Sequence, residues 1–392
     1  MSYGVKRFSS FFVAVIAATL TFVNSGSASA QDDGNGEAAV EALELFVMPQ
    51  SGPFRPDQIS IPQQKMIEAW ARSAHADASA EAFTHWDGEG EVPASCSTCH
   101  SGAGFRAFHG LDGSEPGVAA AVPVGGVVDC ETCHNPGLAE ITAITLPSGI
   151  EHPVKPGVEA ACLTCHSGRA AGVTVSRAVG DKADDTPDPE IGFVNPHYAL
   201  AGALRLGAVG AGGFEYPGKT YSGRFFHARP VADCASCHDP HTLTVAEETC
   251  LTCHETGNFD AIRISRVSYD GSGDLNKGIR SDIASNAALL METIRDYAAN
   301  VAGTPIVYEP HYPYFFVDAD QDGRADEVDG RTASYKAWTP RSLKAAYNWK
   351  FVTADPGAFA HNPQYALELL YDSIEDLSGP LEVDISALGI QR

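Results

Sequence analysis

The 392-residue sequence predicts a mainly α-helical protein with long loops and little β-strand. Apolar residues recur at helical spacing in three segments after residue 280, and strand signals are weak throughout the chain. The middle of the chain supplies a third observation, because all ten cysteines fall in five copies of one short motif between residues 96 and 254. We therefore expect a chain organised around those motifs and not around a sheet.

The repeated motif is Cys-x-x-Cys-His, the attachment sequence of c-type haem. Two thiols separated by two residues can each form a thioether to one porphyrin, and the adjacent histidine then faces the iron as its proximal ligand. The ten predicted attachment residues are Cys96, Cys99, Cys130, Cys133, Cys162, Cys165, Cys234, Cys237, Cys250 and Cys253. The five predicted proximal ligands are His100, His134, His166, His238 and His254.

Two other kinds of structure use paired cysteines, namely a disulfide framework and a structural zinc site. Neither of them requires a histidine after every second cysteine. Five copies of the motif with no cysteine left over therefore favour five covalently bound haem c groups.

The first 30 residues have the three parts of a secretory signal peptide. Lys6 and Arg7 supply the positive charge, an apolar run covers residues 11–23, and Ala28-Ser29-Ala30 matches a small-residue cleavage site. The apolar run is short for a membrane span, and no later segment approaches about eighteen consecutive apolar residues. We expect an exported protein, periplasmic or extracellular, with no membrane span in its mature chain.

The formal net charge is −24, from 26 Lys and Arg against 50 Asp and Glu. Because an acidic surface repels phosphate backbones, we expect no nucleic-acid partner. The acidity suits a cationic redox partner or simply high solubility, and the sequence leaves both explanations open.

The sequence divides into four parts. Residues 1–30 form the signal peptide, 31–60 an acidic lead-in, 61–254 the pentahaem domain, and 255–392 a haem-free helical region that we expect to pack back on the haem domain. Between the third and fourth motifs, the acidic stretch 180–190 contains proline and is predicted to be a surface loop.

The C-terminal region carries the three predicted helices. The first covers residues 283–303, and its apolar residues recur every three or four positions. The second covers residues 340–351. The third follows Asn362 as N-cap with Pro363 in its first turn. Its predicted buried residues are Ala366, Leu370, Ile374 and Leu377.

Each haem iron has a second axial position, which histidine fills most economically. Leaving out Met1, only three methionines could supply sulfur, whereas nine histidines remain after the five proximal ligands. Bis-histidine ligation gives lower reduction potentials than ligation by histidine and methionine. The predicted distal ligands are His75, His197, His227, His241 and His361, with His85 and His311 in reserve. His109 and His152 are expected to have no such role.

His241 is predicted to connect two haems. It follows the fourth motif in His238-Asp-Pro-His241, and three residues extend to about 11 Å at most. This reach is too short to pass round the edge of its own porphyrin, but it suffices to meet the iron of a neighbouring haem.

A calcium site is also predicted in the C-terminal region. Residues 318–329 place aspartates at positions one, three and five of a loop, followed by the glycine of a sharp turn. A solvated acidic turn is the alternative. The run 270–274 is a weaker candidate for the same ion. The candidate ligands of the main loop are Asp318, Asp320, Asp322, Asp326 and Asp329.

The five motifs, the His238-Asp-Pro-His241 step and the closing helix after His361-Asn-Pro resemble the multihaem cytochrome c superfamily. The resemblance covers roughly residues 65–380. The segment from Asp355 to Pro363 is similar to one that carries a distal ligand in pentahaem nitrite reductases. Those enzymes use a Cys-x-x-Cys-Lys haem as catalytic centre, whereas all five motifs here end in histidine. The resemblance therefore implies a multihaem cytochrome c fold and a low-potential electron-transfer protein.

Three functions fit these observations. An electron carrier would pass electrons through bis-histidine haems between redox proteins or to an external acceptor, with no catalytic residue. A multihaem reductase or oxidase would bind a small nitrogen or sulfur oxyanion at one open haem, with Arg169, Tyr198 or His197 as charge and proton donors. A third hypothesis is a homo-oligomeric extracellular haem filament, in which a histidine of one subunit ligates iron in the next. The supply of spare histidines favours the first.

Overall fold

The computed structural model describes residues 63–228 and 231–392. The predicted signal peptide and acidic lead-in lie outside the described residues. The chain divides into two compact units, 1–77 and 78–392. The described part of the first unit contains helix α2 (Gln64–Ala71). No helix among the described residues is both long and apolar enough to cross a membrane.

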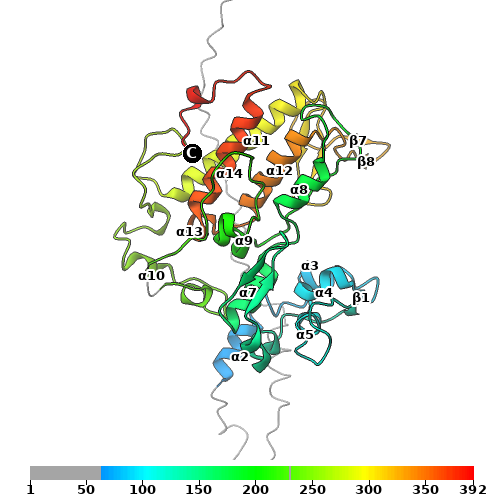
Figure 1. Ribbon diagram of the computed structural model, residues 1–392, viewed down its shortest axis with the longest axis vertical. Helices are drawn as coiled ribbons and strands as arrows, with labels where there is room; N and C mark the ends of the chain where they lie inside the picture. Colours follow the sequence, from blue (N-terminus) through cyan, green and yellow to red (C-terminus); the bar gives the residue numbers. More distant parts are fainter. Residues whose placement is uncertain (1–62, 229–230) are drawn as a thin grey trace, which may run out of the picture. The chain divides into compact units, whose positions relative to one another are not determined.

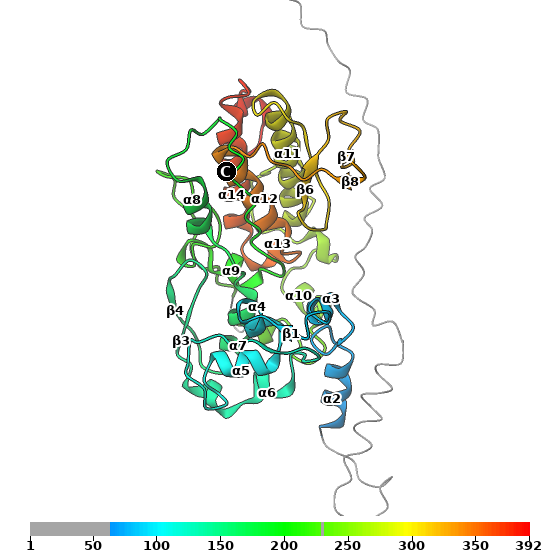
Figure 2. The same ribbon diagram turned by 90° about the vertical axis from the view of Figure 1, so that its right-hand side faces the viewer.

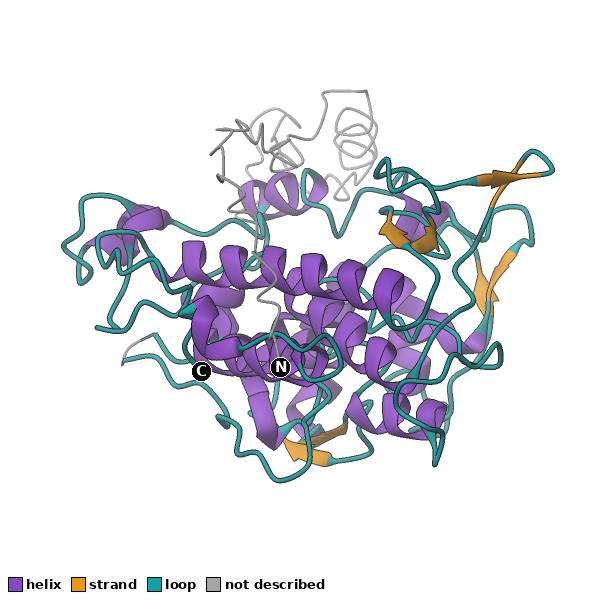
Figure 3. Cartoon of the chain, turned by 90° about the horizontal axis from the view of Figure 1, so that it is seen from above, coloured by secondary structure: helices purple, strands orange, loops and turns teal. Residues whose placement is uncertain are grey.

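Helices are the main regular structure of the second unit, and this confirms the predicted mainly α fold class (Figure 3). The shorter helices are α3 (Glu81–Thr84), α4 (Ala94–His100), α5 (Gly102–Phe108), α6 (Cys130–His134), α7 (Val158–His166), α8 (Gly172–Val179), α9 (Ala201–Leu206), α10 (Glu247–Leu251) and α13 (Ala358–His361). The long helices are α11 (Ile279–Asn300), α12 (Pro340–Thr353) and α14 (Pro363–Ser378).

The strands of the described chain form only antiparallel pairs, each of two short strands. The pairs are β1 (Glu91–Val92) with β2 (Val122–Pro123), β3 (Ala143–Thr145) with β4 (Glu151–Pro153), β5 (Ile306–Tyr308) with β6 (Phe315–Val317), and β7 (Glu327–Val328) with β8 (Arg331–Thr332). These ladders shape hairpins, and they do not build a layer on which helices could pack.

The three long helices pack against one another and form the core of the second unit (Figure 1). Each corresponds to a helix predicted from the sequence. Helix α12 begins after Thr339, whose hydroxyl accepts a hydrogen bond from the Ser342 N–H at 3.1 Å. Helix α14 begins after Asn362, whose side-chain oxygen accepts from the Tyr365 N–H at 3.2 Å. The four residues predicted to be buried in α14 are buried.

The first turn of α11 contains a buried ion pair. Asp282 is fully buried, and its Oδ1 lies 2.6 Å from Nη2 of Arg263, whose side chain is only 4% exposed. Its other oxygen accepts a hydrogen bond from the Tyr269 N–H at 2.8 Å. This carboxylate ties the connection that precedes α11 to the helix itself.

The core also takes in residues between the third and fourth motifs. Val175 of α8 and Leu204 of α9 are fully buried in the same apolar cluster as Leu343 and Tyr347 of α12. The stretch 180–190 between α8 and α9 is an exposed connection without helix or strand, as predicted. Segments far apart in the sequence therefore share one core.

The motif-bearing helices are short and have little apolar core of their own. Helices α4, α5, α6 and α7 contact one another (Figure 2). Only two small apolar clusters lie in this region of the described chain, one around Leu146 and Leu163 and one around Phe105 and Leu138. The C-terminal helices share one large apolar core, whereas the motif-bearing helices bury few apolar side chains. This difference fits a region in which a bulky bound group fills the interior.

Candidate haem sites

Each Cys-x-x-Cys-His motif lies on a helix or a helical turn. We number the motifs as sites 1 to 5 in chain order: residues 96–100, 130–134, 162–166, 234–238 and 250–254. Sites 1, 2 and 3 form the ends of α4, α6 and α7, and site 5 continues from α10. On a helical turn, residues three apart share one face, so both cysteines of a motif are directed to the same side.

Aspartates fix the start of two of these turns. The Oδ1 of Asp129 accepts a hydrogen bond from the Thr132 N–H at 3.1 Å at site 2. Asp233 does the same for the Ser236 N–H at 3.0 Å at site 4. Such caps stabilise a short turn that could not persist alone, and so they hold the thiols in place.

Four of the five motif histidines face a second histidine from another part of the chain. The ring centres are 5.8 Å apart for His100 and His197, 6.0 Å for His134 and His241, 6.2 Å for His238 and His361, and 6.0 Å for His254 and His227. In every pair, one member ends a motif and the other is a distal candidate from the sequence.

These separations fit two imidazoles on one iron. With a metal–nitrogen distance of about 2 Å on each side and a ring radius of about 1 Å, the ring centres would lie about 6 Å apart. At site 1 the two Nε2 atoms point toward each other and are 3.5 Å apart. The side chains present therefore match what a haem iron requires on its two faces.

Hydrogen bonds to Nδ1 orient several of these rings. The Nδ1 of His100 lies 2.7 Å from the carbonyl oxygen of Ala82, and that of His166 lies 2.8 Å from the carbonyl oxygen of Ala199. A carbonyl can only accept, so Nδ1 carries the proton and Nε2 keeps its lone pair for the metal.

The distal histidine of site 4 has a stronger orienting partner. The Nδ1 of His361 lies 2.7 Å from Oδ2 of Asp355, which is buried. Gly357 makes this arrangement possible, because a Cβ there would lie 2.5 Å from Cε1 of His361. The sequence analysis assigned no role to Asp355. The Asp-Pro-Gly turn six residues before His361 is the signal that could have found it.

The electrostatics at site 1 favour neutral imidazoles. Burial, with contributions from His100, Arg169 and Lys350, lowers the pKa of His197 to about 4. Burial is also the main cause that lowers the pKa of His100. A neutral imidazole is the form that binds a metal.

The other histidine candidates are placed as follows. His75 lies in the N-terminal unit, after α2, and its role as a distal ligand stays a prediction. His85 is exposed and lies 3.8 Å from Glu81, and it is among the causes that lower the pKa of His100. His311 is exposed and lies 3.5 Å from Glu309. His109 hydrogen-bonds with Thr164 at 3.0 Å. His152 is buried on β4.

The alternatives for the cysteines find no support in the described chain. All ten cysteines are free of disulfides. Among the described residues, no cluster of cysteines and histidines has the geometry of a metal site.

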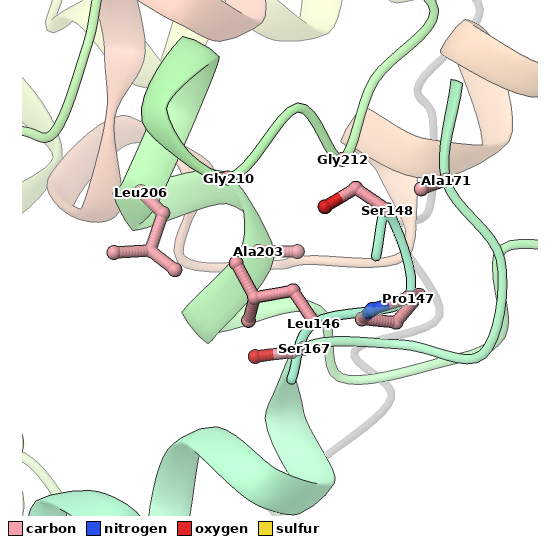
Figure 4. A pocket seen from close by; sticks show the side chains of 9 residues that line it. All are labelled: Leu146, Pro147, Ser148, Ser167, Ala171, Ala203, Leu206, Gly210 and Gly212. Atoms are coloured by element: carbon pink, nitrogen blue, oxygen red, sulfur yellow. The ribbon is translucent and has the colours of Figure 1, made fainter. Parts of the chain in front are cut away.

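The small pocket in Figure 4 lies between the β3–β4 hairpin and α9 and is lined mostly by apolar groups, with none of the candidate ligands. We assign it no ligand.

Three of the five aspartates of the candidate calcium loop come together. Single carboxylate oxygens of Asp318, Asp320 and Asp326 lie within 4.8 Å of one another. Asp322 and Asp329 are exposed and outside this group. Asp270, from the weaker candidate loop, is ion-paired with Lys277, so a cation already occupies that carboxylate.

Comparisons with known proteins agree with the geometry. The chain is 27% identical over 376 residues to the C-type polyheme cytochrome OmcB of Geobacter sulfurreducens, covering 79% of this chain and 48% of that protein. It is 28% identical over 380 residues to the C-type polyheme cytochrome OmcC of the same species, covering 81% and 47%. The chain is a multihaem c-type cytochrome.

Both relatives are named as polyhaem c-type cytochromes. The chain spans about half the length of the curated relatives that it matches. No protein-family model matches the chain. No solved structure matches it either.

Replacing Asp355 by asparagine should raise the midpoint potential of one haem of the cytochrome. A carboxylate partner makes an imidazole more basic and favours ferric iron, whereas an amide does so less. A tenfold loss of preference for the ferric state corresponds to about 60 mV for one electron, and we expect a shift of this order. Spectroelectrochemical titration measures it. The exposed Asp181→Asn variant is the control, and equal titration curves for both variants would contradict the role of Asp355.

Proposed function

We propose that this cytochrome is an electron carrier with five covalently bound haem c groups, one at each of sites 1 to 5. The observation that carries the proposal is the set of four facing histidine pairs, each formed by a motif histidine and a histidine distant in sequence. An iron held by imidazole on both faces has no open position for a substrate. Such a centre exchanges electrons at low potential without making or breaking bonds.

We place this carrier outside the cytoplasmic membrane, in the periplasm or the extracellular space. The support is the predicted signal peptide together with ten cysteines that attachment to haem would consume. The net charge of −24 suits a cationic redox protein as electron donor or acceptor, although an external acceptor would serve the same chemistry.

Two measurements on the purified holoprotein test the proposal. Its intact mass should exceed that of the mature polypeptide by five haem groups. Electron paramagnetic resonance of the oxidised protein should show low-spin ferric iron at sites 1, 2, 4 and 5, where two histidines face each other. A smaller mass excess would overturn the count of five. A high-spin ferric signal that changes when nitrite or sulfite is added would instead favour a reductase with one open haem.

We also propose that the loop from Asp318 to Asp326 binds Ca2+. Asp318 is only 5% exposed, and its Oδ1 has no hydrogen-bond partner. Its Oδ2 accepts a hydrogen bond from the Gly323 N–H at 3.2 Å, at a turn where the φ of +85° requires glycine. A buried carboxylate oxygen without a partner is unfavourable unless a cation binds it, and Ca2+ prefers oxygen ligands.

A residue outside the predicted loop supports this calcium site. Oε1 of Glu309, which follows β5, accepts a hydrogen bond from the Ala325 N–H at 3.2 Å. Glu309 thereby holds the end of the loop that carries Asp326. Asp329, which was predicted as a ligand, lies outside the cluster. The spacing of aspartates within the loop does not indicate Glu309, because Glu309 lies just after β5, the strand that pairs with β6.

Replacing Asp318 by asparagine should weaken Ca2+ binding by about tenfold or more, since it removes charge at the buried oxygen. Titration calorimetry of the holoprotein with calcium chloride measures the affinity. Asp322→Asn is the matched control, because it makes the same chemical change in the same loop at an exposed position outside the cluster. An unmodified protein that binds no Ca2+, or equal losses in both variants, would contradict the site.

A further inference from the structure

Sites 1 and 3 pack directly against each other. The Sγ of Cys99 lies 3.9 Å from the carbonyl oxygen of Thr164, and the Sγ of Cys165 lies 3.9 Å from that of Thr98. The second cysteine of each motif therefore meets the other motif in a reciprocal contact between α4 and α7.

The histidines of the same two sites are linked through one short segment. His197 faces His100 of site 1, and the carbonyl of Ala199 accepts the hydrogen bond from His166 of site 3. Two residues span about 7 Å at most, so the axial positions of the two sites are close as well.

Site 2 borders site 3 through an apolar cluster. Cys133 of site 2 and Cys165 of site 3 both pack on the cluster formed by Phe105, Leu138 and Ala161. Helices α6 and α7, which carry the two motifs, are in contact. Site 3 therefore has site 2 as a second neighbour.

Site 4 meets the other end of α7. Just before α7, Lys155 forms an ion pair at 3.2 Å with Asp233, the residue that caps the turn of site 4. Glu159 in the first turn of α7 binds Arg205, which in turn donates a hydrogen bond to the Ala232 carbonyl at 2.6 Å.

Site 5 lies beside site 4. The backbone of His238 pairs with Val245 in an isolated antiparallel bridge shortly before α10, which carries Cys250. Among the described residues, no hydrogen bond, ion pair or shared apolar cluster links the motif of site 5 to those of sites 1, 2 or 3.

From these contacts we propose that site 3 and site 4 are the two junctions of the haem array and that site 5 is a terminus joined to the array through site 4. Site 3 is bordered by sites 1, 2 and 4. Site 4 is bordered by sites 3 and 5, and also by site 2, because His241, three residues after His238, faces His134. The proposal rests on the five-haem electron carrier proposed above. Contacts between motifs matter because each attached cysteine would be bonded to the edge of its porphyrin, so motifs that touch would bring porphyrin edges together.

Two deletion variants of the holoprotein test the order of the sites. The Cys162→Ala, Cys165→Ala variant removes attachment at site 3, and the Cys250→Ala, Cys253→Ala variant removes it at site 5. Unpaired spins on neighbouring ferric haems broaden and shift one another's resonance signals. Deletion at site 3 should alter the signals of three of the remaining haems, whereas deletion at site 5 should alter one. Equal effects, or a larger effect at site 5, would overturn the proposal.

A second pair of variants keeps all five attachments and covers the case in which a deletion variant fails to fold. His197→Met and His227→Met each replace a distal histidine by methionine, which raises the potential of that haem. At an applied potential that reduces only this haem, its unpaired spin is lost, so the resonance signal of the neighbouring haem should change. The two variants should change different signals, and a common signal or no change would count against the proposed order. The intact mass is measured first. A mass excess of fewer than five haems would contradict the proposed carrier, whereas five haems with unexpected signal changes would contradict only the proposed order of sites.

Discussion

Replacing His361 by alanine should convert the haem of site 4 from low-spin to high-spin in the ferric protein. His361 lies 6.2 Å from His238 between ring centres, and Asp355 fixes its orientation. Alanine removes the imidazole, so the iron of site 4 would keep only its proximal ligand and an open position. We expect the low-spin resonance signal to fall by the contribution of one haem, with cyanide or another small ligand binding to the new centre.

The control for this variant is His311→Ala. His311 is exposed beside Glu309 and faces no motif histidine, so its replacement should leave every haem low-spin. If His361→Ala also kept all haems low-spin, His361 would not be an axial ligand. If both variants gave a high-spin signal, the pairing of histidines proposed from the structure would be wrong.

Replacing Asp282 by alanine should lower the free energy of unfolding by about 3–5 kcal/mol. The change leaves the buried guanidinium of Arg263 without its carboxylate and removes the acceptor for the Tyr269 N–H. A buried charge that loses its partner cannot recover its hydration in place. Chemical denaturation followed by far-ultraviolet circular dichroism, at equal haem content, measures the effect.

Glu292→Ala is the matched control for this prediction, because Glu292 lies on the exposed face of the same helix. An exposed substitution of this kind should change the free energy of unfolding by less than about 0.5 kcal/mol. Equal stabilities for the Asp282 and Glu292 variants would show that the ion pair contributes little.

Local signals in the sequence predicted the secondary structure well. The helical period placed α11, and the caps Thr339 and Asn362 mark where α12 and α14 begin. The predicted start of α11 was four residues too late. Ile279 continues the apolar spacing four residues before Ile283, but Gly278 at the N-cap offers no capping side chain to mark the start. Helix starts that depend on capping side chains are therefore easier to predict than starts that depend on packing.

The calcium loop shows where a sequence pattern reaches its limit. The spacing of aspartates identified the loop, yet only Asp318, Asp320 and Asp326 converge. Asp329 lies in the β7–β8 turn with a φ of 53° and is exposed. The hydrogen bond that the Ala325 N–H donates to Glu309 depends on strand pairing, which the spacing of residues within the loop does not encode.

By itself, the sequence determined the attachment chemistry of this cytochrome. Two thiols and a histidine within five residues are a local constellation, so the five motifs predict ten attachment cysteines and five proximal histidines without any knowledge of the fold. Only the tertiary structure decided which histidine faces which motif and which motifs touch. His197 is 97 residues from His100, and such a pairing depends on the packing of α7, α9 and the C-terminal helices, which no local pattern records.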